Sequence, residues 1–364
     1  MTATLFDPIN LGAIPAPNRI LMAPLTRGRS EGEHVPISDL KAEYYSQRAT
    51  AGLIIAEATG ISQEGLGWPS APGIWSDDQV KAWKPVTQAV HDAGGRIILQ
   101  LWHMGRLVHP DFLGGAQPVS SSATTAPGYA HTAEGKKDYT EARALDISEI
   151  PRVIADYVHA AKNAIAAGFD GVQIHAANGY LIDQFLRDNT NLRTDDYGGA
   201  IENRIRLLRE VTQSVVDAVG AERTSVRLSP NGETQGADDS NPVALFTAAA
   251  SALQDIGIAF LELREIKPYG NFGQTEVPRI STEIRKVFKG PLVLNQEYTK
   301  ELADADLASG LADAISFGRP YISNPDLAER LRTGAELAPD NFKTWYSPGA
   351  EGYTDYPFLE KADA

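Results

Sequence analysis

The sequence contains no cysteine, which excludes disulfide bonds, iron–sulfur clusters, thiolate zinc sites and a cysteine nucleophile. It is also short of basic residues, with 33 Lys and Arg against 47 Asp and Glu, and its formal net charge is −14. Nucleic acids and anionic membranes attract clustered Lys and Arg. We therefore expect neither as a partner.

Long apolar runs are missing as well. The longest ones are strand-sized, about half of what a membrane span requires. The N-terminus, MTATLFDPINLG, has no basic segment followed by an apolar one, so no signal peptide is expected. These features predict a soluble, cytoplasmic protein, as a monomer or a homodimer.

What the sequence does contain is a regular alternation of short apolar segments with amphipathic ones. Segments 148–168 and 201–220 place apolar residues at the i, i+3, i+4, i+7 spacing of a helix. Ser148 suits the N-cap of the first helix, and Gly168 and Gly220 suit the ends of the two. The apolar segments are typical of strands buried on both faces. They are 19–25, 53–60, 96–103, 171–177, 224–230, 260–265, 291–297 and 313–320.

Eight strand–helix units in succession predict one closed parallel (β/α)8 barrel over residues 1–364. The main alternative is an open doubly wound sheet, which would carry G-x-G-x-x-G after its first strand; the segment there is APLTRGRS. A minimal barrel needs about 250 residues, so the remainder must form excursions. We expect a lid or hairpin at 104–147 after strand 3, a long loop at 266–290 after strand 6, and a C-terminal tail at 335–364.

The reactive side chains of such a barrel lie at the C-terminal ends of its strands. There the sequence places amides, imidazoles and guanidinium groups, which donate hydrogen bonds to oxygens rather than attack. It has no His-x-His and no lysine at a strand end, so neither a metal-dependent hydrolase nor a Schiff-base aldolase is favoured, and no metal site is expected. This profile is typical of a barrel whose cofactor carries the chemistry.

The segment after the last strand, SFGRPYISNPDL, indicates a phosphate site. Gly318 would allow close approach of the backbone, Arg319 would supply charge, and Asn324 would cap a new helix. The alternative is that Arg319 pairs with a carboxylate at the rim of the barrel. A phosphorylated cofactor or substrate is the favoured interpretation.

Seven motifs, in order along nearly the whole chain, resemble the old yellow enzyme family of FMN-dependent, NAD(P)H-dependent ene-reductases. The resemblance runs from about Leu5 to GYTDYP at 352–357. Its most specific block spans residues 175–199. The motifs are NRILMAPLTRGR, AEATGISQEGLGWPSAPGIW, QLWHMGR, HAANGYLIDQFLRDNTNLRTDDYGG, ENRIRLL, VRLSPNG and DAISFGRP.

The resemblance implies a non-covalently bound FMN. Thr26 would bond the O4 edge of the flavin, Arg227 would place charge near N1 and O2, and backbone amides with the Arg319 guanidinium would hold the phosphate. The complete set of implied cofactor contacts is Pro24, Leu25, Thr26, Ala58, Gln100, His175, Arg227, Asn295, Gln296, Gly318 and Arg319.

The resemblance also assigns roles within the stretch DGVQIHAANGYL. His175 and Asn178 would form a donor pair for the substrate oxygen, and Tyr180 would be the proton donor. Position 68 is Trp where many relatives carry Tyr, and the pair is His/Asn where some have His/His. The implied substrate pocket comprises Thr26, Trp68, Trp102, His175, Asn178, Tyr180, Phe272 and Tyr353.

The implied activity is reduction of the C=C bond of α,β-unsaturated carbonyls, maleimides and nitroalkenes, and of nitrate esters, with NADPH or NADH as the electron donor. Phenols would be inhibitors, and the kinetics would be ping-pong. Two alternatives stay open. One is another FMN barrel dehydrogenase, which would want a lysine near the flavin and a Ser or Cys base. The other is a non-catalytic flavin- or ligand-binding barrel, which would predict loss of His175, Asn178 and Tyr180.

Overall fold

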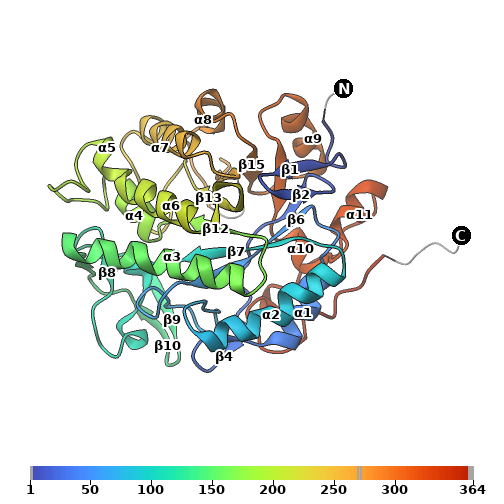
Figure 1. Cartoon of the computed structure of the whole chain (residues 1–364), viewed down its shortest axis with the longest axis horizontal. Helices are drawn as coiled ribbons and strands as arrows, with labels where there is room; N and C mark the ends of the chain where they lie inside the picture. The colour runs from blue at the N-terminus through green and yellow to red at the C-terminus, as the bar shows by residue number, and fades with distance from the viewer. Residues whose placement is uncertain (1–2, 269, 271–272, 360–364) are drawn as a thin grey trace, which may run out of the picture.

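Eight parallel strands close into a barrel in the computed structural model, which describes residues 3–268, 270 and 273–359 (Figure 1). Closure comes from β16 pairing with β3, where Ile315 lies opposite Ile20. The predicted (β/α)8 fold is therefore confirmed. The barrel strands are β3 (Ile20–Met22), β6 (Leu53–Gly60), β7 (Ile97–Trp102), β12 (Gly171–His175), β13 (Thr224–Leu228), β14 (Phe260–Arg264), β15 (Leu292–Asn295) and β16 (Ala314–Phe317).

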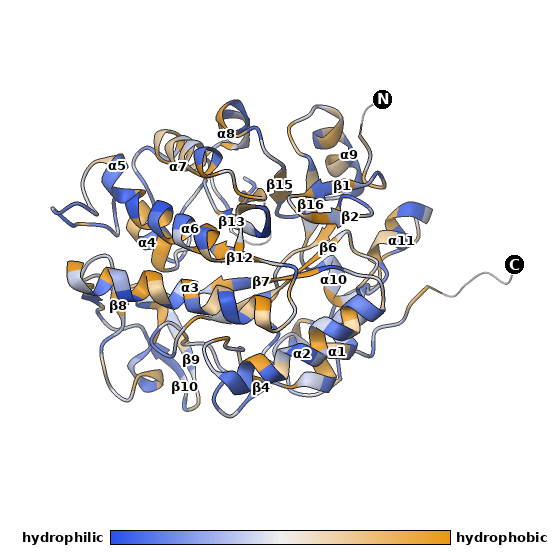
Figure 2. Ribbon diagram, viewed as in Figure 1, coloured by the Kyte–Doolittle hydropathy of each residue, from blue (hydrophilic) through white to orange (hydrophobic). Residues whose placement is uncertain are grey.

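Helices surround the barrel and turn their apolar faces toward it (Figure 2). Within the part of the chain that the structure describes, no helix is both long enough and apolar enough to span a membrane. The helices are α1 (Ser38–Ser46), α2 (Asp77–Asp92), α3 (Ile150–Ala166), α4 (Leu181–Leu186), α5 (Ile201–Arg204), α6 (Arg206–Val219), α7 (Pro242–Ile256), α8 (Ser281–Val287), α9 (Lys300–Ala308), α10 (Pro320–Ser323) and α11 (Leu327–Thr333).

Both predicted helices are present, although the first begins later than predicted and the second is divided. A 3-10 turn precedes α3, and its capping box is formed by Asp146 and Glu149, so the N-cap prediction for Ser148 was wrong. The segment 201–220 is divided at Ile205 into α5 and α6. It ends as predicted at Gly220, whose φ of 99° suits a residue without a side chain.

The N-terminal end of the barrel is filled with apolar side chains. A hairpin of β1 (Ile9–Leu11) and β2 (Ile14–Ala16) contributes Leu11 and Ile14 to a buried cluster with strand residues such as Leu53. Apolar packing therefore closes this end of the barrel, and its active side chains are expected at the opposite end.

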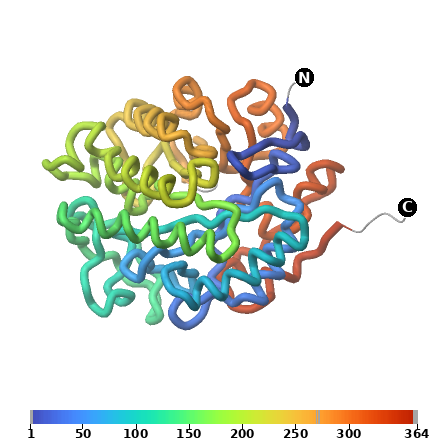
Figure 3. The backbone as a smooth tube through the Cα atoms, in the orientation of Figure 1, coloured from blue at the N-terminus to red at the C-terminus, as the bar shows by residue number. Residues whose placement is uncertain are grey.

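The excursion after β7 contains the predicted hairpin, β9 (Tyr129–Thr132) with β10 (Gly135–Asp138), which projects from the body of the molecule (Figures 1 and 3). Two short parallel strands, β8 (Val119–Ser120) and β11 (Arg143–Ala144), close its base. The predicted loop at 266–290 is shorter than expected, because residues 281–287 of it form the barrel helix α8. A last pair of short strands, β4 (Ser30–Glu31) and β5 (Val35–Pro36), follows β3.

The tail after residue 335 folds back onto the loop that follows β3. Two buried arginines hold it through main-chain carbonyls: Arg27 Nε donates to the Trp345 oxygen at 3.0 Å, and Arg29 Nη1 donates to the same oxygen at 2.7 Å. Arg29 Nη2 also donates to the Thr344 oxygen at 3.1 Å. The tail is thus part of the barrel's upper end, and Trp345 and Tyr346 reach the cavity described next.

Candidate active site

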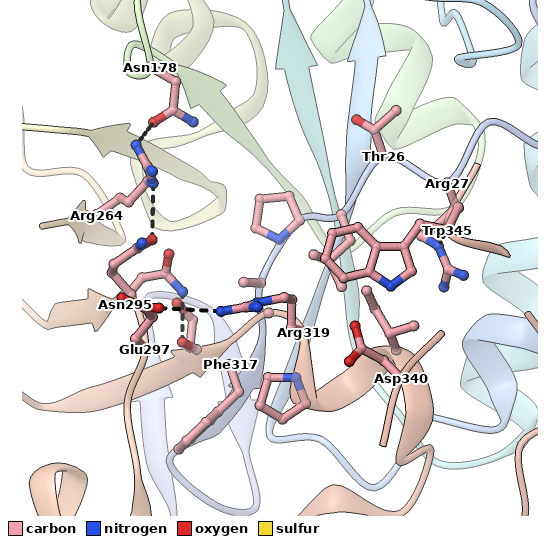
Figure 4. Close-up of a pocket in the computed structure, with 18 of the residues that line it drawn as sticks. Thr26, Arg27, Asn178, Arg264, Asn295, Glu297, Phe317, Arg319, Asp340 and Trp345 are labelled. Carbon is pink, nitrogen blue, oxygen red and sulfur yellow. Dashed lines mark hydrogen bonds and ion pairs between the residues drawn. The ribbon is translucent and has the colours of Figure 1, made fainter. Parts of the chain in front are cut away.

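A cavity of about 790 Å³ opens at the C-terminal ends of the strands, within the size range of small-molecule sites (Figure 4). The loops after β3, β6, β12, β13, β15 and β16, the end of β14 and the tail contribute to its walls. Twelve of the residues expected around the cofactor and substrate line it. These are Pro24, Leu25, Thr26, Trp68, Trp102, Asn178, Tyr180, Arg227, Asn295, Gln296, Gly318 and Arg319.

The donor turn, residues 175–180, follows β12 and is fixed by hydrogen bonds to its backbone. Asn178 and Gly179 both have positive φ angles, 60° and 77°, which Asn tolerates and Gly adopts freely. The Asn178 N–H donates to Ser229 Oγ at 2.8 Å, and the Gly179 N–H donates to Asp183 Oδ2 at 2.8 Å. Gln235 Nε2 donates to the Asn178 carbonyl at 2.7 Å. The side chains of the turn are therefore held on a rigid backbone.

Three aromatic rings meet beside this turn. The Tyr180 ring lies edge-on to His175, with centroids 4.9 Å apart, and edge-on to Trp102 at 5.0 Å. His175 Nδ1 and Trp102 Nε1 are buried and have no hydrogen-bond partner among the described residues. A buried polar atom without a partner is costly, so such atoms indicate a place where a ligand binds.

The protonation states of the two titratable groups follow from their burial. Burial lowers the pKa of His175 well below its usual value, and the charges of Arg227 and Arg264 lower it further. Burial raises the pKa of Tyr180 above its usual value. At neutral pH the site therefore presents a neutral imidazole beside a protonated phenol, and both can donate a hydrogen bond.

A chain of buried polar side chains, which we call the barrel relay, crosses the barrel and reaches the cavity at Ser316. Its members are Gln100, Gln173, Glu262 and Ser316. Gln100 Nε2 donates to Gln173 Oε1 at 2.8 Å, and Gln173 Nε2 donates to Glu262 Oε2 at 2.9 Å. The Ser316 hydroxyl donates to Glu262 Oε1. Because the carboxylate only accepts, it sets the direction of both amides and leaves the Gln100 carbonyl oxygen facing away from the relay.

The barrel relay also supports Arg227. Arg227 Nη1 lies 3.3 Å from Glu262, and Arg227 Nη2 donates to Asn295 Oδ1 at 2.8 Å. Asn295 Nδ2 in turn donates to the Ser316 carbonyl at 2.8 Å. The Nε of Arg227 is buried and has no partner within the described residues. The arginine is therefore locked in place while one donor is left over.

The segment after β16 differs from its prediction in two respects. Helix α10 begins directly at Pro320, and Asn324 ends it instead of capping a new helix; the N-cap of α11 is Asp326. Arg319 Nη2 lies 3.3 Å from Glu297 Oε1, the rim pairing that the alternative interpretation expects. The phosphate role of Arg319 is accordingly argued below as a proposal.

Several predicted residues lie away from the cavity surface. Ala58, Gln100 and His175 are buried beneath it, 6%, 1% and 4% exposed. Tyr353 is fully buried and stacks on Tyr44 with centroids 3.9 Å apart, so the expectation that it lines the pocket was wrong. Phe272 lies outside the described residues.

The tail supplies two cavity residues that the sequence did not identify, Trp345 and Tyr346. The Tyr346 ring lies 5.5 Å from the Trp68 ring, which also packs at 5.5 Å against His131 of β9. The hairpin and the tail therefore meet at one wall of the cavity. In the sequence, only the adjacency of a Trp and a Tyr in a stretch rich in Gly and Pro could have indicated that these two residues reach the cavity.

The donor set fits FMN. The cavity combines a left-over donor on the buried cation Arg227 with a second cation at Arg319, and an orphaned imidazole nitrogen of His175 lies beneath its surface. The Gln100 carbonyl, oriented by the barrel relay, is a ready acceptor for a ring N–H. A polar heterocycle with an anionic phosphate needs donors, one acceptor and positive charge in this arrangement.

Comparisons with known proteins agree with this fit. Residues 4–338 match the NADH:flavin oxidoreductase / NADH oxidase family. The chain is 43% identical to a putative 12-oxophytodienoate reductase 11 of Oryza sativa subsp. japonica, covering 98% of each. It superimposes with a TM-score of 0.97 on the old yellow enzyme homologue from Zymomonas mobilis, at 63% identity and covering 98% of this chain and 100% of that one.

Morphinone reductase in complex with tetrahydroNAD is a further structural match, with a TM-score of 0.93 at 44% identity and 98% of each chain covered. The family model and these relatives extend over nearly the whole chain, including the donor turn and the segment after β16. The chain therefore belongs to the NADH:flavin oxidoreductase / NADH oxidase family, the old yellow enzyme family, and is an FMN-dependent oxidoreductase that takes its electrons from NAD(P)H.

Proposed function

We propose that the protein reduces the C=C bond of activated alkenes: α,β-unsaturated carbonyls, maleimides and nitroalkenes, with nitrate esters as further substrates. The observation that carries this is the donor turn. It brings the Asn178 amide and the protonated Tyr180 phenol to the wall of the cavity and packs His175, whose buried Nδ1 has no partner among the described residues, edge-on against Tyr180. Reduction of an activated alkene needs an anchored oxygen and a proton source, and these groups can supply both.

FMN, when bound, supplies hydride chemistry at its ring, and we propose that this cavity holds it. Arg227 offers its remaining donor to the N1 and O2 edge, Gln100 and Ala58 meet the pyrimidine end, and Thr26 bonds the O4 edge. The other contacts proposed, toward the ring and the phosphate, are Pro24, Leu25, His175, Asn295, Gln296, Gly318 and Arg319.

His175 and Asn178 are proposed to donate to one substrate oxygen, a carbonyl or a nitro oxygen. Their hydrogen bonds strengthen as negative charge develops on that oxygen, and each such donor is typically worth about 3 kcal/mol in the transition state. Tyr180 keeps its proton because burial raises its pKa, and it delivers that proton to the substrate Cα. Trp68, Trp102 and Thr26 shape the space around the alkene.

The nicotinamide donor and the alkene are proposed to use the same cavity in turn. The cavity at the C-terminal ends of the barrel strands is lined by Asn178, Tyr180 and Arg227, so both would approach the cofactor from there. Ping-pong kinetics follow, with parallel lines in double-reciprocal plots. We further propose that residues 104–147 act as a lid, because His131 of the hairpin packs on the cavity residue Trp68.

The test separates the two half-reactions. The purified protein is reduced without oxygen by NADPH or NADH while flavin absorbance is followed, and is then mixed with cyclohexenone, N-ethylmaleimide, a nitroalkene or a nitrate ester. We expect bleaching by the nicotinamide and recovery of absorbance with the enone, together with a saturated ketone as product. Bleaching without recovery by any of the four oxidants would leave a flavin-binding reductase and contradict the proposal.

A further inference from the structure

Arg264, the last residue of β14, contacts the donor turn across the intervening strand β13, since the turn follows β12. Its Nη1 donates to Asn178 Oδ1 at 3.0 Å, and its Nε donates to Gln296 Oε1 at 3.1 Å (Figure 4). Arg264 lines the cavity together with both amides. One guanidinium thus bridges the turn after β12 and the loop after β15 through two side-chain amide oxygens.

The chemistry of this contact determines which end of the Asn178 amide faces the substrate. The oxygen and the NH2 group of a side-chain amide have nearly the same shape, so packing alone does not distinguish them. A guanidinium carries only donors. It accepts only the orientation in which Oδ1 faces it, and the NH2 group is then directed elsewhere.

We propose that Arg264 is a positioning residue that fixes the Asn178 side-chain amide with its NH2 group toward the substrate oxygen. This inference rests on the proposed function of Asn178 as a donor, and it deepens that function. Without the arginine, the amide could turn its oxygen to the substrate, where it would repel the developing negative charge. The hydrogen bond to Gln296 holds the guanidinium itself in place.

An arginine suits this task better than a lysine. The two amide oxygens are reached by different nitrogens of one planar group, Nη1 and Nε, whereas an ammonium is a single point donor on a flexible stem. The same cation also disfavours protonation of His175, whose pKa is lowered by burial first and by Arg227 and Arg264 next. Arg264 thereby favours the neutral imidazole of His175 and the orientation of Asn178 in which its NH2 group faces the substrate oxygen.

The decisive experiment is a double-mutant cycle on the FMN-loaded enzyme, with p-hydroxybenzaldehyde as the probe. Its phenol oxygen is expected to take the place of the substrate oxygen, and binding is followed by flavin absorbance, without turnover. We expect Arg264→Met to weaken binding about tenfold in the natural background and less than twofold in Asn178→Ala, because the arginine acts through the amide. Equal losses in both backgrounds would overturn the proposal.

Arg264→Lys is the second variant, should the methionine variant lose its FMN or its fold. It keeps the charge but can satisfy only one of the two oxygens, so we expect a smaller loss of probe affinity that also disappears in Asn178→Ala. If the loss of probe affinity persisted in Asn178→Ala, or if Arg264→Lys bound the probe with full affinity, the charge of the side chain would matter and the orientation of the Asn178 amide would not.

Arg279→Met is the matched control. Arg279 pairs with Glu265, the neighbour of Arg264, and with Asp306, and it does not line the cavity. We expect the probe affinity of this variant to be unchanged. A tenfold loss would show that removing any positive charge near the end of β14 weakens binding, and it would overturn the proposal. Because the readout is binding, failure of every alkene to react would contradict the proposed function without touching this result.

Discussion

The barrel relay and the donor turn are two polar groups of one site, and they differ in how their hydrogen bonds are used. In the barrel relay the hydrogen-bond partners are other side chains: Gln100 bonds Gln173, and Gln173 bonds Glu262. In the donor turn the backbone is bonded, but His175 Nδ1 has no partner within the described residues. The directions of the first group are fixed by its own side chains, with the Gln100 carbonyl oxygen as its open acceptor, whereas the second group leaves a buried nitrogen without a partner.

This difference indicates two kinds of occupant. A permanent cofactor is best held by groups whose directions are already fixed, since little order is then lost on binding. An exchanging substrate is best met by donors that are left unsatisfied, because leaving a buried donor unpaired costs about 1–3 kcal/mol and an arriving oxygen removes that cost. Changes in the donor turn should therefore affect the alkene, and changes in the barrel relay should affect the flavin.

The largest expected effect is that of His175→Ala on alkene reduction. The change removes a donor that strengthens as charge develops on the substrate oxygen, so the rate should fall roughly a hundredfold or more. It is measured as flavin reoxidation by cyclohexenone after anaerobic reduction. His159→Ala is the matched control, because His159 bonds the Trp75 carbonyl outside the cavity. A loss of less than threefold in His175→Ala would remove the imidazole from the proposed donor pair.

Tyr180→Phe comes next and separates the acid from the donors. The ring and its contacts with His175 and Trp102 are kept, and only the acidic proton is deleted. Enone reduction should slow by roughly tenfold or more, because the proton for Cα must then come from water. Flavin reduction by NADPH needs no proton from this position and should survive. A nitroalkene should suffer less, since its nitronate product is stable without protonation.

The contrast between the two oxidants decides that prediction. Stopped-flow traces of flavin reoxidation by cyclohexenone and by a nitroalkene are recorded on the same batch of reduced Tyr180→Phe and compared with each other. Wild-type rates with the enone would mean that another group is the acid.

A smaller effect is expected from the barrel relay. Glu262→Gln replaces an acceptor-only group by an amide, which releases the direction of Gln173 and hence of Gln100. It also removes the negative charge beside Arg227. We expect FMN affinity to fall roughly tenfold. The reduction potential should rise, because the uncompensated cation favours the more negative, reduced flavin. Both are measurable without an alkene, by ultrafiltration and by dye equilibration.

The same variant tests the separation of the two groups. Once saturated with FMN, Glu262→Gln should bind p-hydroxybenzaldehyde with nearly natural affinity, since the donor turn contacts other residues. A large loss of probe affinity would show that the barrel relay and the donor turn act as one network.

The barrel was predictable from sequence because its strands are buried on both faces. Every residue of β6 is buried, and its sequence LIIAEATG is apolar except for Glu57 and Thr59. The donor turn was predictable too, because His175, Asn178 and Tyr180 are close in sequence and follow a strand end. Local order along the chain is enough to predict features of this kind.

What the sequence did not predict depends on contacts between distant segments. Tyr353 was placed in the pocket because it resembles a family motif, but the tail buries it against Tyr44 and turns Trp345 and Tyr346 to the cavity. Glu262 stands in an apolar strand with no local sign of its partner Arg227 35 residues earlier. Register across the barrel, which sets such pairs, is a property of the closed sheet rather than of any one segment.

The smallest expected effect is that of pH on the alkene half-reaction. A pKa of His175 below its usual value near 6.5 means that the imidazole gains a proton only in acid well below that pH. A pKa of Tyr180 above its usual value near 10 means that the phenol loses its proton only in alkali above that pH. Neither group changes charge in between, so flavin reoxidation by cyclohexenone should vary less than about twofold from pH 6.5 to 9. The profile is measured by stopped-flow in buffers of constant ionic strength, with Tyr180→Phe alongside. A tenfold fall per pH unit near 8 in the natural enzyme, absent from Tyr180→Phe, would mean that the phenol ionises early; the donor turn would then be far more open to water than its burial implies.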